Sequence, residues 1–379
     1  MSNSRWDIFC RVVDNYGDIG VCWRLARQLH AEYGFTVRLM VDDLASFQRI
    51  QSDIALDQCQ QQCSGVEVLH WREPAIELEP SDVVIEAFAC DLPASYIAVM
   101  KATPGDRVWL NLEYLSGEDW VLGCHGLPSP AQGLPKFFFF PGFVDGTGGV
   151  LGELVQRVAR AAWLVADAGA YLAQWQRPQV DSLKISLFAY ANSGLAELLQ
   201  LWQNSSTPVQ VFMPEGLLLP LASAALGQDL CVGQTIALGS LTLTVLPMQS
   251  QDDYDRLLWS CDLNFVRGED SFVRAQWAGL PMVWHIYPQD DDAHRVKLAA
   301  FLTHYLATCP REAALVLNEF WLAWNHAGDL QAAWHKLLPA LPSLREHAQG
   351  WAEQLLRRGD LATNLVKFVN SKVKYGVKF

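Results

Sequence analysis

The chain has 379 residues, of which 51% are hydrophobic and 18% are charged, and its formal net charge is −13. This length exceeds a single ordinary core and predicts two domains, and the composition excludes long disordered regions. The acidic balance argues against a nucleic-acid-binding protein, which needs a basic surface. The nine scattered cysteines and the lack of a long apolar segment are typical of a reduced protein, so we expect a cytoplasmic location, no disulfides and no membrane contact.

Apolar strands alternate with helical segments in the first half of the chain. The first strand is expected at 7–13, and a turn over 14–20 leads into a helical pattern that carries Val21, Leu25 and Leu29 on one face. Further strands are expected at 37–41, 83–85, 108–112 and 137–140. Such alternation predicts a parallel sheet covered on both faces.

The same alternation begins again near Leu183. Strands are expected at 184–190, 209–213, 241–246, 262–266 and 281–286, and the region from 293 onward is mostly helical. We therefore predict two Rossmann-like doubly wound α/β domains, over 1–181 and 182–361. They are expected to face an interdomain cleft, because ligands of such sheets bind outside the carboxyl ends of the strands.

The turn after the first strand reads Asp14-Asn15-Tyr16-Gly17-Asp18-Ile19-Gly20. It lacks the G-x-G-x-x-G pattern of a dinucleotide-binding turn, and its two carboxylates would repel a phosphate. Carboxylates at a strand end suit general-base work on an acceptor nucleophile. In the alternative interpretation, Asp18 caps the following helix and Asp14 forms an Asx turn. The local sequence leaves both interpretations open.

A second motif, Arg267-Gly268-Glu269-Asp270-Ser271, lies between the strand at 262–266 and a helix expected at 271–278. A helix N-terminus offers free backbone N–H groups to an anion, and Arg267 adds a planar fork that suits phosphate oxygens. Ser271 can donate its hydroxyl or cap the helix. Glu269 and Asp270 would accept hydrogen bonds from sugar or ribose hydroxyls, or hold the loop in shape. The alternative is an ordinary capped turn between a strand and a helix.

Several aromatic and amide side chains are expected at the same edge of the second sheet. Phe188 and Tyr190 are two residues apart on one strand and share a face, Gln251 and Tyr254 begin a helix, and Tyr287 follows a strand end. A pyrimidine base could stack on such an aromatic ring while an amide contacts its edge. Each of these residues, considered alone, also fits ordinary core packing.

The run Asp290-Asp291-Asp292 contains the D-x-D pattern that binds metal and nucleotide sugar in one single-domain fold of glycosyltransferases. Here it leads into a late helix, so we interpret it as an acidic helix start with Asp290 lining the site. Cys59 and Cys63 form a C-x-x-x-C without a second pair of ligands. We therefore expect no metal ion.

Five segments in this order resemble the protein-arginine rhamnosyltransferases that modify elongation factor P. They are DNYGDIGVCWRLARQL from Asp14, KISLFAY at 184–190, QSQDDYD at 249–255, FVRGEDSFVRAQWAGLP from Phe265 and WHIYPQDDDAH at 284–294. The resemblance spans essentially the whole chain. It implies the GT-B fold, with an N-terminal acceptor domain, a C-terminal nucleotide-sugar domain, and a last helix at about 362–379 that packs back on the first domain.

The resemblance also implies an inverting, metal-independent reaction, and we expect a monomer. A single rhamnose would pass from dTDP-β-L-rhamnose to an arginine of elongation factor P, which activates that factor to rescue ribosomes stalled at polyproline. Asp18 would be the general base, Asp14 would orient the acceptor, and Glu269 would be essential to the donor pocket. The other residues implied to hold the donor are Asn15, Tyr16, Gly17, Phe188, Tyr190, Gln251, Tyr254, Arg267, Asp270, Ser271, Tyr287 and Asp290.

The nucleophile sets the main energetic problem of this reaction. Free arginine has a pKa above about 12, so its full deprotonation at neutral pH costs on the order of 7–8 kcal/mol. Two carboxylates can instead grip the guanidinium while a proton passes to Asp18 as the C–N bond forms. Two rival functions are a GT-B transferase that uses a UDP-sugar and a carbohydrate or lipid acceptor, and a non-catalytic protein that binds a nucleotide sugar.

Overall fold

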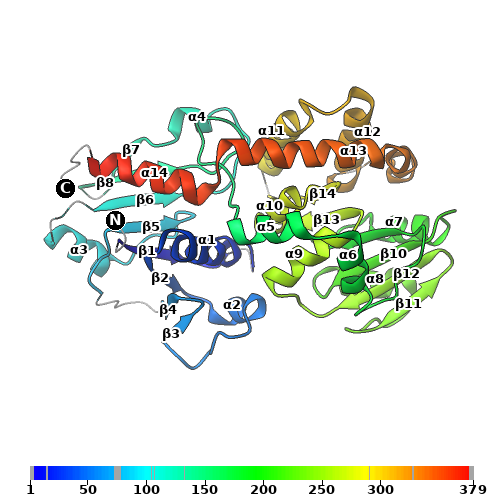
Figure 1. The fold of residues 1–379 in the computed structure, drawn as a ribbon, viewed down its shortest axis with the longest axis horizontal. Helices are drawn as coiled ribbons and strands as arrows, with labels where there is room; N and C mark the ends of the chain where they lie inside the picture. The colour runs from blue at the N-terminus through cyan, green and yellow to red at the C-terminus, as the bar shows by residue number, and fades with distance from the viewer. Residues whose placement is uncertain are drawn as a thin grey trace. The chain divides into compact units, whose positions relative to one another are not determined.

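The computed structural model describes residues 4–13, 16–71, 78–103, 105, 107–131, 133–289, 291–326 and 328–374. Its chain forms two compact units (Figure 1). Unit 1 comprises Met1–Leu154 and Leu355–Phe379, and unit 2 comprises Val155–Gln354. Each unit is built on its own sheet and is described by itself.

An eight-stranded sheet forms the centre of the described part of unit 1, in the order β3-β4-β2-β1-β5-β6-β8-β7. The strands are β1 (Arg5–Cys10), β2 (Thr36–Val41), β3 (Gln60–Cys63), β4 (Val66–His70), β5 (Val83–Ala87), β6 (Val108–Leu112), β7 (Pro128–Ala131) and β8 (Leu134–Phe139). The pairs β3–β4 and β7–β8 are antiparallel, and the other pairs are parallel. The predicted parallel sheet is therefore confirmed, with an antiparallel hairpin at each edge.

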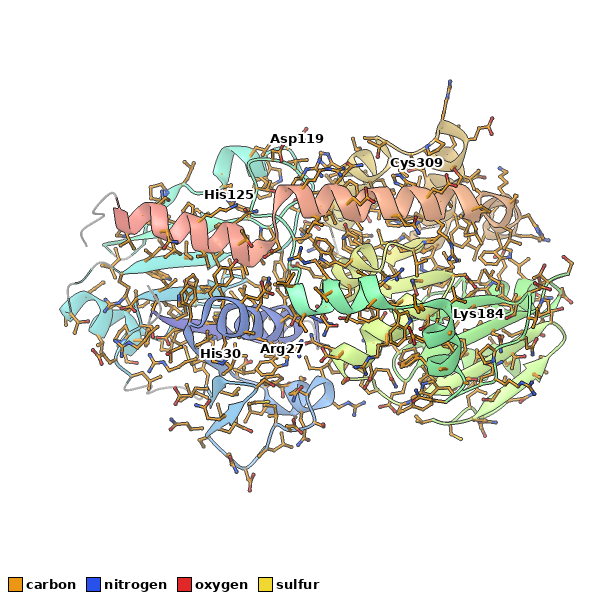
Figure 2. The ribbon with its side chains drawn as sticks, viewed as in Figure 1. Arg27, His30, Asp119, His125, Lys184 and Cys309 are labelled. Carbon is orange, nitrogen blue, oxygen red and sulfur yellow. The ribbon has the colours of Figure 1, made fainter. Side chains whose placement is uncertain are left out.

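The helices of unit 1 are α1 (Gly17–Tyr33), α2 (Leu44–Ile50), α3 (Ala94–Ala102), α4 (Val121–Cys124) and α14 (Leu361–Lys374). Helix α1 ends where Gly34 adopts the left-handed conformation, with φ of 69°, and donates its N–H to the carbonyl of His30. Arg27 of α1, labelled in Figure 2, donates to Glu153 at 2.9 Å and so ties the last segment of unit 1 to this helix. Helix α14 is fastened to α1 by Tyr33 and Thr363, whose hydroxyls lie 2.9 Å apart.

Unit 2 contains a six-stranded sheet in the order β11-β12-β10-β9-β13-β14, as far as the structure describes it. The strands are β9 (Leu183–Leu187), β10 (Val209–Pro214), β11 (Thr235–Leu238), β12 (Leu241–Leu246), β13 (Leu263–Arg267) and β14 (Met282–His285). The strand pairs are parallel, except that β11 pairs antiparallel with β12. Helices of this unit are α5 (Leu154–Ala162), α6 (Val165–Leu172), α7 (Leu195–Gln203), α8 (Leu218–Leu226), α9 (Gln251–Ser260), α10 (Asp270–Ala278), α11 (Ala293–Leu306), α12 (Arg311–Asn325) and α13 (Leu330–Arg358), whose last turn belongs to unit 1.

Each sheet has one position where the strand order reverses. In unit 1 the chain runs from β1 outward through β2 and then returns to β5 on the other side of β1. In unit 2 it runs outward from β9 through β10 and returns to β13 on the other side of β9. The carboxyl ends of the two strands at such a switch point diverge into loops on opposite faces, which leaves a crevice for a ligand. The loops after β1, β5, β9 and β13 are therefore where functional residues are expected.

The bounds of the units differ from the predicted bounds of the domains. The first boundary lies between Leu154 and Val155 rather than between 181 and 182, and the second follows Gln354 rather than 361. Helices α5 and α6 precede the first strand of unit 2 but pack within this unit, because Tyr171 donates to the carbonyl of Asp253 at 2.9 Å and Arg160 donates to that of Ala278 at 2.8 Å. The sequence alternation restarts only at the strand, so it does not reveal these two leading helices.

Candidate functional site

Asp18 lies at the switch point of unit 1, in the first turn of α1 after the β1 loop. Its side chain is 2% exposed. One carboxylate oxygen accepts the backbone N–H of Val13 at 2.8 Å, and the other accepts the hydroxyl of Tyr114 at 3.1 Å. Asp18 is thus a buried acid whose orientation is fixed from two directions.

Asp18 is not the N-cap residue of α1. The N-cap residue of α1 is Tyr16, which makes no side-chain cap hydrogen bond, and its carbonyl accepts the N–H of Gly20 at 2.9 Å. The Asp18 carboxylate reaches outside the helix to the preceding loop instead. Tyr16 and Gly17 are half-buried at this turn. Asp14 and Asn15 lie outside the described residues, so their expected roles stay predictions.

The thiol of Cys10 adds no charge beside Asp18. A hydrogen bond with Cys22, followed by burial and the negative charges of groups that include Asp18, raises the pKa of Cys10 well above its usual value. Cys10 and Cys22 are both fully buried. Because Cys10 stays protonated at neutral pH, Asp18 does not have a thiolate of Cys10 as a neighbour.

Tyr114 was not predicted from the sequence as a site residue. It follows β6, the neighbour of β5, and its ring stacks on Phe88 at 4.3 Å between centroids with planes 14° apart. Phe88 directly follows β5 at the switch point and has a φ of 55°, in the left-handed region that favours glycine. A non-glycine residue with positive φ at a strand end is a signal of function, but it is visible only in the folded chain.

Arg267 lies at the switch point of unit 2, as the last residue of β13. Its guanidinium carbon lies 4.3 Å from the centroid of the Phe188 ring and 4.9 Å from that of Tyr190. The side chain is buried, and its Nη1 atom has no hydrogen-bond partner among the described residues. A buried guanidinium held by two aromatic rings, with a donor left over, is suited to bind an anion.

The loop after Arg267 has a specific geometry. Gly268 has a φ of 60°, and its carbonyl accepts the indole N–H of Trp284 at 2.9 Å. The hydroxyl of Ser271 accepts the backbone N–H of Arg267 at 3.0 Å and donates to the carbonyl of the same residue. Glu269 is the N-cap residue of α10 without a side-chain cap hydrogen bond. Ser271 therefore fixes the turn rather than capping the helix, and α10 begins one residue earlier than expected, at Asp270.

Other described residues predicted in unit 2 contact Arg267 or one another. The Phe188 ring contacts Tyr254 edge to face at 5.6 Å, and Gln251 donates to Asp270 at 3.0 Å, which joins the starts of α9 and α10. Burial raises the pKa of Tyr254, against smaller opposing effects that include the hydroxyls of Ser271 and Ser186. The structure thus brings aromatic rings from the loop after β9 and from α9 to the guanidinium at the end of β13, with an amide of α9 bonded to the start of α10.

His285, the last residue of β14, is a residue of this cluster that the sequence did not indicate. Its ring lies 5.6 Å from that of Tyr190, which contacts the half-exposed Tyr287 at 5.3 Å on another side. Burial first, and then the charge of Arg267, lowers the pKa of His285 to about 4. The imidazole is therefore neutral at pH 7, so it does not place a second cation beside Arg267. Asp290 lies outside the described residues.

The described residues contain neither a cluster of metal ligands nor a membrane-spanning helix. No group of three or more His, Cys, Asp or Glu side chains there has the arrangement of a metal site. No helix in the same part of the chain combines the length and the apolar character that crossing a membrane requires. The expectation of a metal-independent reaction stays a prediction.

The two sites have different chemical capacities. In unit 1 a buried carboxylate lies beside an aromatic hydroxyl, which suits proton transfer from a cationic group. In unit 2 the guanidinium and the N-terminus of α10 suit a diphosphate, and the aromatic rings beside them suit a nucleobase. Together they suit a reaction between a nucleotide-activated donor and a polar acceptor.

Comparisons with known proteins agree with these capacities. Residues 6–370 match the family model described as "Elongation-Factor P (EF-P) rhamnosyltransferase EarP". The chain is 50% identical to the protein-arginine rhamnosyltransferase of Pseudomonas putida over 97% of this chain and 99% of that relative. It is 49% identical to the protein of that name from Pseudomonas aeruginosa, over 96% and 98% of the two chains.

Solved structures extend the comparison. A structure described as the basis for EarP-mediated arginine glycosylation of translation elongation factor EF-P is 38% identical, has a TM-score of 0.69, and is matched over 97% of this chain and 99% of that one. A glycosyltransferase from Rickettsia africae has a TM-score of 0.53 at 8% identity, over 99% of both chains, and shares the fold alone.

Proposed function

This chain belongs to the family of elongation factor P rhamnosyltransferases, which have the GT-B fold, and from this premise we propose its reaction. The protein transfers a single rhamnose from dTDP-β-L-rhamnose to an arginine side chain of elongation factor P, with inversion at the anomeric carbon. The modification activates the factor for the rescue of ribosomes stalled at polyproline. The observation that carries this proposal is the pair of switch points, one with the acid Asp18 and one with the cation Arg267.

The donor binds unit 2. Phe188, Tyr254 and Gln251 hold the thymine nucleoside, and Arg267 with the N-terminus of α10 holds the diphosphate. Support comes from the Nη1 atom of Arg267, which is buried without a partner among the described residues and would bond a phosphate oxygen. Further donor contacts are assigned to Asn15, Tyr16, Gly17, Tyr190, Glu269, Asp270, Ser271, Tyr287 and Asp290. Because a cation and a helix N-terminus already offset the diphosphate charge, we propose a reaction without a metal ion.

The acceptor arginine approaches Asp18, with Asp14 as the second acid. The reaction is a single displacement in which a guanidinium nitrogen bonds the anomeric carbon while the bond from that carbon to the diphosphate oxygen breaks. The electron pair leaves with the nucleoside diphosphate, and the proton passes from nitrogen to Asp18. Asp18 suits this role because its two hydrogen bonds fix its orientation before the substrate arrives.

Arg267 and α10 act on the leaving group. Negative charge grows on the diphosphate as its bond to the sugar breaks, and fixed positive groups stabilise that charge without having to reorganise. The two aromatic rings and the hydroxyl of Ser271, which binds the Arg267 backbone, keep the guanidinium in place. We also propose that the protein works in the cytoplasm, where translation factors act, and as a monomer, which light scattering after size-exclusion chromatography tests.

Intact mass spectrometry of elongation factor P tests the reaction. Purified factor is incubated with this protein and dTDP-rhamnose, and we expect a gain of one deoxyhexose that peptide mapping assigns to arginine. Factor with lysine in place of that arginine is the control and should gain nothing. Absence of any gain, or a gain on another residue type, contradicts the proposal. Proton NMR of the product, showing an α-linked sugar, tests inversion.

Nucleotide preference separates this donor from a UDP-sugar. The thymine methyl needs its own apolar contact, so we expect dTDP to raise the melting temperature of the protein more than UDP at equal concentration. An equal or larger shift with UDP would favour a different donor. In vitro translation of a polyproline message, with modified and unmodified factor, tests the rescue.

A further inference from the structure

An aromatic pair lies beside the buried acid of unit 1. Phe88 and Tyr114 follow the neighbouring strands β5 and β6, and their rings stack at 4.3 Å with planes 14° apart. The hydroxyl of Tyr114 reaches Asp18 at 3.1 Å. Asp18 is 2% exposed, whereas Tyr114 is 41% exposed. Tyr114 is therefore the accessible member of this hydrogen-bonded pair.

The backbone that carries Phe88 is held in an unfavourable conformation. Phe88, Ala89 and Asp91 have φ values of 55°, 52° and 54°. Two interactions hold the start of this loop: the N–H of Phe88 binds the carbonyl of Leu112 at 2.7 Å, and that of Ala89 binds the buried side chain of Asn111 at 3.1 Å. Residues other than glycine keep a positive φ when the surrounding structure enforces that conformation, often at ligand-binding sites. Here the enforced loop places the Phe88 ring against Tyr114.

We propose that Tyr114, supported by Phe88, is the platform on which the guanidinium of the acceptor arginine stacks, and that its hydroxyl positions Asp18. This inference rests on the proposed function. A guanidinium is planar, weakly hydrated and attracted to the face of a tyrosine ring, and its edge presents parallel N–H donors to a carboxylate. A ring face and a carboxylate joined by one hydrogen bond offer both contacts to one guanidinium.

The platform also accounts for selection of arginine over lysine. A lysine ammonium is compact and strongly hydrated, and it has no plane to align with a ring. It would gain a charge contact with Asp18 without the orientation that stacking provides. Tyr114 thus acts on acceptor binding through its ring and on the orientation of Asp18 through its hydroxyl.

Three variants of Tyr114 separate these two effects in steady-state kinetics with elongation factor P varied at saturating dTDP-rhamnose. Tyr114→Leu removes ring and hydroxyl, and we expect a KM for the factor about 10-fold higher and a kcat about 10-fold lower. Tyr114→Phe keeps the ring and should lower kcat about 5-fold with KM within about 2-fold. Tyr114→Trp keeps a stacking face and should match Tyr114→Phe. Calorimetry should give unchanged dTDP affinity for all three.

Tyr33 offers a matched control at the opposite end of α1. Its ring stacks on Phe35 at 5.6 Å with planes 18° apart, and its hydroxyl binds Thr363 at 2.9 Å. Tyr33→Leu should leave both kinetic constants within about 2-fold, because this pair does not contact Asp18. If Tyr114→Leu does not fold, Phe88→Leu takes its place, with a higher KM expected from the loss of the supporting ring.

An unchanged KM in Tyr114→Leu overturns the platform, and so does a loss of dTDP affinity equal to the loss of turnover. A KM raised equally by Tyr114→Phe and Tyr114→Leu assigns the binding effect to the hydroxyl and also overturns it. Wild-type protein that never modifies elongation factor P overturns the proposed function, and with it this assignment. The two failures are therefore distinguishable.

Discussion

The two sheets place their functional residues at the same topological position and give them opposite charges. At the switch point of unit 1, Asp18 is hydrogen-bonded by a backbone N–H and by Tyr114. At the switch point of unit 2, Arg267 is packed between Phe188 and Tyr190, with one buried donor atom unpartnered in the described part of the chain. The acid is oriented by polar contacts, and the cation by aromatic faces.

In the proposed reaction, this difference lets one architecture serve two substrates. The parallel sheet determines where a ligand binds, and the side chains at the switch point determine which ligand it is. A carboxylate there suits a cationic acceptor, and a guanidinium suits an anionic donor. The comparison leads to a prediction. A substitution at one switch point should change the binding or the turnover of one substrate and leave the binding of the other largely unchanged.

Asp18→Asn should produce the largest effect. Asparagine keeps the shape and an acceptor oxygen for Val13 but cannot take a proton, so we expect kcat to fall about 1,000-fold. The dTDP affinity, measured by calorimetry, should stay within about 2-fold of wild type. Asp42→Asn is the matched control, since Asp42 accepts the N–H of Val12 at 2.8 Å in the same loop, and it should remain active. Normal turnover of Asp18→Asn would remove this acid from the mechanism.

Arg267→Ala should come next, with the opposite selectivity. Loss of a buried cation that bonds phosphate should weaken dTDP binding about 100-fold, or about 3 kcal/mol. Arg267→Lys keeps the charge without the planar fork and should lose about 10-fold. Arg345, which pairs with Asp262 at 2.7 Å before the amino end of β13, is the control, and Arg345→Ala should bind dTDP normally. If Arg267→Ala binds dTDP with wild-type affinity, the assignment of Arg267 to the diphosphate is wrong.

His285 links the electrostatics of unit 2 to pH. Its folded pKa of about 4 lies below its ordinary value of 6.5, so between these values the unfolded chain binds a proton that the folded chain does not. Stability should therefore fall as pH falls through this window, and His285 should account for about 2 kcal/mol of the loss from pH 7 to pH 5.

Urea unfolding of wild type and His285→Gln at both pH values measures this contribution. The variant should lose about 2 kcal/mol less than wild type over the same interval, while the other histidines contribute equally to both proteins. Equal losses would show that His285 titrates normally and would remove the argument that Arg267 is kept apart from a second cation.

Trp284→Phe should give the smallest effect. It removes the indole N–H that binds the carbonyl of Gly268 and keeps an aromatic ring against Phe272, so dTDP affinity should fall only about 5-fold, or about 1 kcal/mol. Trp321 makes a bond of the same kind, 2.9 Å long, to the carbonyl of Met282. Trp321→Phe should lower the melting temperature without changing dTDP affinity. Equal affinities of the two variants would exclude a specific role of the Gly268 turn.

Most central strands were predictable, and so was the edge strand β14, whereas the edge strands β3, β7 and β11 and the inner strand β4 were not. β5 and β6 are buried along their whole length and read as apolar runs, whereas the outer strands β3 and β7 have the sequences QQQC and PSPA. An edge strand faces solvent and a single neighbour, so neither hydrophobic alternation nor a continuous apolar run distinguishes it. The sequence also contains no local signal that α5 and α6 belong to unit 2, so the predicted boundary was placed just before β9 instead of before α5.

Some residues of the two sites were predictable from the sequence, and others were not. Asp18 and Arg267 lie in short motifs beside a strand end, where the sequence already restricts the chemistry. Tyr114 belongs to no such motif, and His285 lies in the segment 284–294 without a predicted role. They reach the sites because β6 pairs with β5 and β14 pairs with β13. That Asp18 is not the N-cap residue of α1 also needed coordinates, since it depends on which residue begins the helix.

The sequence by itself therefore determined the α/β class, the two sheets and the charged residues at two strand ends, because periodicity and local motifs are properties of neighbouring residues. Only the tertiary structure decided that these ends are switch points, that Tyr114 binds Asp18, and that two aromatic rings hold Arg267. Those facts depend on strand order and on long-range side-chain packing, in which residues distant in the chain become neighbours.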